Sequence, residues 1–182
     1  CISSAASDVY KRQISEIEKE IEKRLNSVEE LKGYLREQKS IYQSTPIGYP
    51  VKGYITSGFG WRIHPITKRK SFHHGVDIRA PSGTPIHCTA DGIVSYEGKT
   101  KYNGNFIVIE HGYGFSTLYA HNMRNLVKTK QRVKRGDIIA YLGSTGRTTG
   151  PHLHYEVWRN RKKVNPLSYL NSHWGGGNAW KK

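Results

Sequence analysis

Histidine and aspartate occur at metal-ligand spacing in the segment Phe72–Asp77. A β-strand sends alternate side chains to the same face, so His73 and Asp77 are expected to share one face of a strand. His74 then points the other way, toward the opposite layer or solvent. The spacing alone does not choose between His73 and His74, but only His73 shares a face with Asp77.

A second segment, Gly150–Tyr155, carries His152 and His154, again two residues apart. Both rings are expected on the same face of a strand, and spacing does not choose between them. His121 lies between the two segments in the sequence. If the two strands lay side by side, their histidines and the aspartate would face one point.

Imidazole nitrogen and carboxylate oxygen suit a borderline metal such as zinc, and three protein ligands leave a fourth position for water. Neither Cys1 nor Cys88 belongs to a Cys-x-x-Cys pair, so a cysteine-rich structural zinc site is not indicated. Most single histidines in proteins are surface or core residues. Two clusters with compatible spacing favour a catalytic metal site instead.

The chain resembles the lysostaphin/LytM-type zinc metallopeptidases, which are peptidoglycan endopeptidases. The resemblance spans about residues 50–170 in the family's order. It is carried by the His-x-Gly-x-Asp run at 73–77, Tyr119-Ala120-His121, the His-x-His pair at 152–154, and the flanking runs Ser57–Arg62, Ala80–Pro85 and Gly143–Gly146.

This resemblance implies that His73, Asp77 and His154 bind one zinc ion, with His121 and His152 as the catalytic pair. It implies metal-assisted amide hydrolysis, in which zinc lowers the pKa of its bound water from about 15.7 toward about 7. A neutral imidazole with a pKa near about 6.5 can then serve as the general base. We assign that role to His152, although the two histidines could exchange roles.

Arg62 and His64 follow a Gly-Phe-Gly turn close to the first cluster. Substrate binding is one interpretation of these two residues, but a solvated basic loop is favoured. Tyr155 points off the face of His152 and His154, so we expect it to pack in the core.

The first 45 residues predict a helical, coiled-coil-like segment followed by a linker. Apolar residues recur at steps of three and four, averaging 3.5, which favours an amphipathic helix over about residues 8–40, broken or frayed near Gly33. The linker is expected at Ser44–Gly48. The apolar stripe must be buried by a coiled-coil partner, by the catalytic domain or by a second copy of the chain, and we favour the coiled coil. It consists of Ile14, Ile17, Ile21, Leu25, Val28, Leu31 and Leu35.

Residues 46–171 are expected to form the zinc peptidase domain, and residues 172–182 a flexible tail. Short alternating apolar runs separated by Gly, Asn and Pro predict a mainly β, antiparallel architecture. The resemblance adds a split-barrel-like or sandwich-like core with an open groove. The predicted fold class is therefore an antiparallel β-sheet catalytic domain with an N-terminal amphipathic helix.

The charge of +15 lies entirely in the second part of the chain. Residues 1–45 carry eight basic and eight acidic residues, whereas residues 46–182 carry 21 basic and six acidic ones. Such a field attracts polyanions at long range. Because no nucleic-acid motif is present, we expect no nucleic-acid partner and take peptidoglycan, an anionic wall mesh, as the partner.

The sequence also predicts the cellular location of the protein. There is no run of 18 apolar residues, so no membrane span is expected within the chain. The chain lacks a signal peptide and does not begin with Met, which favours a mature form or a piece of a longer protein. Cys1 is either a lipidation site or, as we favour, a boundary. We expect the bacterial envelope, periplasmic or extracellular, with membrane anchoring of the full-length protein left open.

Two other functions are compatible with the sequence besides zinc-dependent hydrolysis. One is a non-hydrolytic module that binds the wall or regulates an amidase; the other is a basic polyanion-binding protein. The complete ligand set favours the hydrolase. Among peptidoglycan bonds, directly cross-linked stems are favoured over glycine bridges, because a coiled coil resembles envelope-remodelling relatives.

Overall fold

The computed structural model describes residues 2–63 and 68–170. The chain forms two compact units, Cys1–Tyr42 and Gln43–Lys182, which we describe separately. The predicted tail at 172–182 and His64 lie outside the described residues.

Helix α1 (Ile2–Ser44) accounts for the first unit and is longer than predicted. It continues through Gly33, so the expected break there is wrong. A glycine inside a helix costs only about 1 kcal/mol relative to alanine, and its neighbours Leu31, Lys32 and Leu35 are good helix formers.

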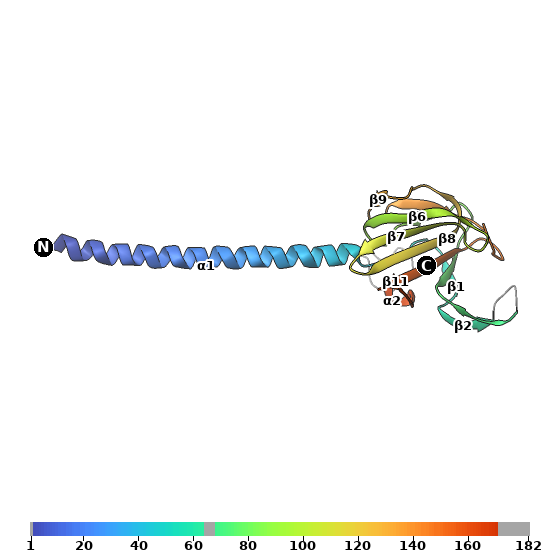
Figure 1. Ribbon diagram of the computed structural model, residues 1–182, viewed down its shortest axis with the longest axis horizontal. Helices are drawn as coiled ribbons and strands as arrows, with labels where there is room; N and C mark the ends of the chain where they lie inside the picture. Colours follow the sequence, from blue (N-terminus) through green and yellow to red (C-terminus); the bar gives the residue numbers. More distant parts are fainter. Residues whose placement is uncertain (1, 64–67, 171–182) are drawn as a thin grey trace. The chain divides into compact units, whose positions relative to one another are not determined.

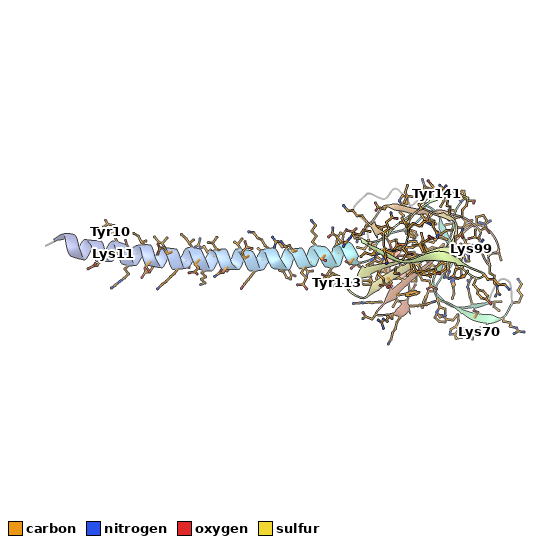
Figure 2. All side chains as sticks on the ribbon, turned by 45° about the horizontal axis from the view of Figure 1, so that its top comes forward. Tyr10, Lys11, Lys70, Lys99, Tyr113 and Tyr141 are labelled. Carbon is orange, nitrogen blue, oxygen red and sulfur yellow. The ribbon has the colours of Figure 1, made fainter. Side chains whose placement is uncertain are left out.

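The apolar stripe of α1 is open to solvent. Figure 2 shows side chains standing out along the helix, with Tyr10 and Lys11 labelled near its start. Its members are each 46–61% exposed: Ile14, Ile17, Ile21, Leu25, Val28, Leu31 and Leu35. Within the described part of the chain, no helix combines the length and the apolar character that crossing a membrane requires.

The second unit is a β domain, and its last described element is the short helix α2 (Leu167–Leu170). Its strands are β1 (Tyr54–Ser57), β2 (Gly60–Ile63), β3 (Lys70–His73), β4 (Val76–Arg79), β5 (Pro85–His87), β6 (Gly92–Thr100), β7 (Gly104–Gly112), β8 (Phe115–Asn125), β9 (Arg132–Val133), β10 (Ile138–Leu142), β11 (Leu153–Arg159) and β12 (Lys162–Val164).

One large sheet runs in the order β1-β4-β11-β8-β7-β6-β9, while β10 pairs with β5 and β8, and β12 pairs with β11. In Figure 1, β11, β8, β7 and β6 lie side by side. Strands β2 and β3 form a separate two-stranded sheet. The pairings are antiparallel, which confirms the predicted mainly β class with an N-terminal helix.

Alternation along β11 divides its side chains between the two faces of the large sheet. Tyr155 is fully buried in the main core, as predicted, together with Leu153 and Val157. His154 and Glu156 alternate with them and therefore lie on the opposite face. Burial of one face thus holds the other face, which carries the site, in register.

The predicted linker after α1 is bound to the β domain. The backbone N–H of Ile47 donates to the carbonyl of Thr89 over 3.0 Å, and Gly48 donates to Tyr169 over 3.0 Å. Val51, a few residues on, is buried in the main core. The segment therefore belongs structurally to the β domain.

Candidate metal centre

The three predicted ligand side chains, those of His73, Asp77 and His154, converge where β4 pairs with β11. Asp77 Oδ1 lies 2.9 Å from His154 Nδ1 and 3.1 Å from His73 Nε2, and the two ring nitrogens lie 3.1 Å apart. His73 and Asp77 are buried and His154 is half-buried. A single ion could contact all three groups.

Strand register explains this convergence. His154 lies directly opposite Asp77 in the β4–β11 ladder, and opposite residues have Cβ atoms about 4.5–5.5 Å apart. The prediction that His73 and Asp77 share one strand is wrong, because β3 ends at His73 and β4 begins at Val76. The two ligands therefore come from different sheets, joined by a two-residue connection.

Gly75 lies in that connection, against the site. A Cβ atom added there would lie 2.5 Å from the carbonyl oxygen of Tyr155 and 2.9 Å from His154 Cε1. Only glycine permits such a close approach of the connection to β11. The glycine of the His-x-Gly-x-Asp run is thus needed to bring the two ligand segments together.

Hydrogen bonds to the far side of each ligand ring fix its protonation. His73 Nδ1 lies 2.7 Å from the carbonyl oxygen of Gly58, and His154 Nε2 lies 3.2 Å from Glu156 Oε1. A carbonyl or carboxylate oxygen only accepts, so in the neutral rings these nitrogens carry the proton. His73 Nε2 and His154 Nδ1 therefore keep their lone pairs and face Asp77.

Two lone pairs and a carboxylate oxygen this close repel one another unless a positive charge lies among them. Nitrogen and oxygen donors with hydrogen-bonded outer partners are the set expected around zinc. The residues present therefore fit a divalent metal ion. Among the described residues, the side chains whose ligand atoms lie close enough to hold one metal ion are those of His73, Asp77 and His154. His152 is not one of them.

The charges of the ligand set are strongly coupled. Burial alone would raise the pKa of Asp77, but hydrogen bonds with His154 and His73 outweigh it and hold that pKa well below its usual range. Burial alone lowers the pKa of His154, but hydrogen bonds to Asp77 and Glu156 raise it to about 9. A proton therefore competes with a metal ion for the His154 ring.

Glu156 contacts the ligand cluster, and the sequence interpretation missed it. Its carboxylate is buried and accepts hydrogen bonds from His154, from Trp158 Nε1 at 2.7 Å and from Lys163 Nζ at 3.0 Å. Burial favours the neutral acid, but these partners outweigh it and lower the pKa to about 2. Its position two residues after His154, on the same strand face, was the available signal.

His121 and His152 lie beside the ligand set, with ring centroids 4.8 Å apart. His152 Nε2 lies 3.8 Å from Asp77 Oδ1. The Nδ1 atom of His121 donates to the carbonyl of Thr145, and that of His152 donates to the carbonyl of Gly150, each over 2.8 Å. Both neutral rings therefore keep an unprotonated Nε2 that can accept a proton.

A bulge in β8 directs His121 to the site. Ala120 lies opposite His154 and Asn122 opposite Asn105, while His121 has a φ of 65° in the left-handed region. Non-glycine residues seldom adopt this conformation, which is enriched at functional sites. Burial lowers the pKa of His121 to about 4, so the ring stays neutral at physiological pH.

The position of Arg62 contradicts the prediction of a solvated basic loop. It lies on β2, not in a solvated basic loop, and its Nη2 atom pairs with Asp77 Oδ2 over 3.2 Å. Its side chain is 29% exposed. The guanidinium holds the outer oxygen of the carboxylate while Oδ1 faces the two ligand histidines. Sequence separation hid this contact, because β2 belongs to the other sheet.

An open cavity of about 460 Å³ lies over this cluster. Its walls come from β1, β2, β3, β4, β8 and β11, from the turn between β6 and β7 and from the loop before β11. The lining includes the five predicted site residues, the exposed His74, and three arginines: Arg62, Arg79 and Arg147. The cluster is therefore accessible to a ligand from outside.

Residues 71–166 match peptidase family M23. The chain belongs to this family. The matched range of the M23 domain contains all five predicted site residues, and the resemblance to lysostaphin/LytM-type metallopeptidases is confirmed.

The M23 domain is similar to curated proteins and to solved structures. It is 52% identical over 123 residues to peptidoglycan DD-endopeptidase ShyB of Vibrio cholerae, covering 65% of this chain and 29% of that protein. A zinc-containing peptidase from Vibrio cholerae superposes with a TM-score of 0.61 at 42% identity, covering 72% and 40% of the two chains. The catalytic domain of lysostaphin from Staphylococcus simulans gives 0.60 at 31% identity, covering 66% and 93%.

The lysostaphin match confirms the fold of the M23 domain. The chain spans less than a third of the length of the curated relatives it matches.

Proposed function

We propose that this chain is a zinc-dependent endopeptidase that hydrolyses peptide cross-links or stem peptides of bacterial peptidoglycan. The observation that carries the proposal is the convergence of three ligand atoms beside two imidazoles with free Nε2 atoms. Relatives support the substrate class, since ShyB is a peptidoglycan DD-endopeptidase and Mpg of Neisseria meningitidis a DD-carboxypeptidase/endopeptidase.

In this proposal His73, Asp77 and His154 hold one zinc ion. Two nitrogen donors favour zinc over magnesium or calcium, which take oxygen ligands. Zinc held by these residues would supply polarisation of the scissile carbonyl and a water whose pKa is lowered toward about 7. Glu156 and Arg62 orient the ligands from outside and do not touch the substrate's reacting atoms.

The proton transfers belong to the two remaining histidines. His152 Nε2 takes a proton from the attacking water, because its Nδ1 is already committed to Gly150. The proton then passes to the nitrogen of the leaving amine, directly or by way of His121. His121 is placed for this delivery, because its ring centroid lies 4.8 Å from that of His152.

Two alanine variants test these roles against each other. In His152→Ala, we expect hydrolysis of purified peptidoglycan to fall at least about 100-fold while zinc remains bound. In Asp77→Ala, zinc and activity should be lost together. Metal content by mass spectrometry and new amine ends in the digest are the measurements. Loss of zinc from His152→Ala would make that residue a ligand and contradict the assignment.

The same experiment separates the other functions. Zinc-independent binding to peptidoglycan without new amine ends would replace the hydrolase with a wall-binding or amidase-regulating module. Affinity for nucleic acid with a steep salt dependence and without zinc would indicate a polyanion-binding protein.

We further propose that the protein works in the bacterial cell envelope, periplasmic or extracellular, and that α1 forms a coiled coil. The exposed apolar stripe of α1 supports this second proposal, because its spacing matches a helical partner or a second copy of the chain. For the bond, we propose directly cross-linked stems. Mass spectrometry of the released muropeptides identifies the bond that is cut.

A further inference from the structure

The cavity over the metal ligands carries a surplus of positive charge. Three arginines line it, and among the described residues its lining holds only two carboxylates, Asp77 and Glu156. A divalent ion at the proposed site would add to this surplus. Negative charge is therefore needed from a ligand if the cavity is to be neutralised.

Both carboxylates are already paired within the protein. Asp77 pairs with Arg62 over 3.2 Å in addition to its two ligand histidines, and Glu156 pairs with Lys163 over 3.0 Å. Neither acid is left to balance the other two arginines.

Arg79 and Arg147 lack such partners. Within residues 2–63 and 68–170, neither guanidinium has an ion pair or a side-chain hydrogen bond, and both residues are exposed. Arg79 shares a face of β4 with Asp77, two residues away. Arg147 lies in the loop that leads to His152, where its backbone N–H donates to the carbonyl of Tyr102 over 3.0 Å.

We propose that Arg79 and Arg147 bind a free carboxylate of the substrate and so determine its class. A guanidinium matches a carboxylate with paired donors. Stem peptides carry free carboxylates, whereas a glycine bridge carries none and would leave both arginines unpaired. The inference rests on the proposed function and assigns the site to carboxylate-bearing peptides.

A matched pair of substrates tests this assignment. Two synthetic cross-linked stem peptides are prepared, identical except that the free carboxylates of one are carboxamides in the other. For the zinc-loaded protein we expect kcat/KM to be at least about tenfold higher on the carboxylate peptide. Dissociation constants of both peptides for His152→Ala provide a readout that does not need hydrolysis.

Arginine substitutions then test which residues cause the preference for the carboxylate peptide. Arg79→Gln combined with Arg147→Gln should bring the ratio of kcat/KM values close to one, mainly through KM. The control is Arg132→Gln, on β9 at the other end of the large sheet, which removes an exposed arginine outside the cavity. It should keep the preference of the wild type.

Equal kcat/KM for the two peptides, or an equal loss of preference in Arg132→Gln, would overturn the inference. The latter result would assign the preference to the general positive charge of the domain. If neither peptide is hydrolysed, the proposed function fails, and the dissociation constants still decide whether the two arginines select carboxylates.

Discussion

At the scale of single residues, the proposed metal site has a carboxylate behind one of its ligands. Glu156 accepts a hydrogen bond from His154 Nε2 and is itself held by Trp158 and Lys163. The negative charge makes the ring more basic and fixes which nitrogen faces Asp77. We expect Glu156→Gln to weaken zinc affinity about 10- to 100-fold. Competition with a chelating dye measures the affinity.

A matched control for this variant is Glu110→Gln, an exposed glutamate on β7 that accepts a hydrogen bond from Ser116. It should leave zinc affinity unchanged. The melting temperature of the zinc-free variant checks that the fold survives. Unaltered affinity in folded Glu156→Gln would mean that the neighbouring backbone alone orients His154.

At the scale of elements, α1 presents a stripe of apolar side chains that are each 46–61% exposed. Isoleucine and valine at 14, 21 and 28 recur every seven residues, as at the a positions of a coiled coil. We expect the 182-residue chain to self-associate at micromolar concentrations. The double variant Ile21→Glu with Val28→Glu should be monomeric, because association through the stripe would bury the two new carboxylates. Analytical ultracentrifugation measures the mass.

Lys19→Glu is the control, since Lys19 lies outside the stripe. It should leave the mass unchanged. A wild-type chain that sediments as a monomer at all concentrations would show that α1 needs a different helix as its partner.

At the scale of the whole molecule, a buried network makes the fold sensitive to acid. His111 lies between the carbonyl of Asp91 at 2.8 Å and Thr117 Oγ1 at 2.7 Å, and the hydroxyls of Thr117 and Tyr119 continue the network. Burial lowers the pKa of His111 to about 4. The ring is therefore held neutral in the folded protein.

We expect the free energy of unfolding to fall as the pH drops from about 6.5 to about 4. In this window the unfolded chain binds a proton at residue 111 that the folded chain does not, so the folded state loses up to about 3 kcal/mol. Urea unfolding of the zinc-free protein across this range measures the loss. His111→Gln keeps a donor and an acceptor but does not titrate, and its profile should be flatter. Parallel profiles would exclude His111 as the cause.

Local sequence rules predicted much of the fold. The 3.5-residue repeat predicted α1, and alternating runs predicted most strands of the large sheet, because both signals depend on residues close together in the chain. The strands that were missed, β2, β9 and β12, are only two to four residues long and partly basic. Such segments become strands only because a neighbouring strand satisfies their backbone hydrogen bonds.

For the site, the sequence by itself determined which residue types could hold a metal and on which face of β11 they lie. Tertiary structure decided the rest: it placed His73 on a different sheet from Asp77, brought Arg62 to the carboxylate, and set Glu156 behind His154. Alternation fixes the face of a side chain within one strand, whereas its neighbours across strands depend on register and turns. Those are set by burial of the whole core, which no local spacing reports.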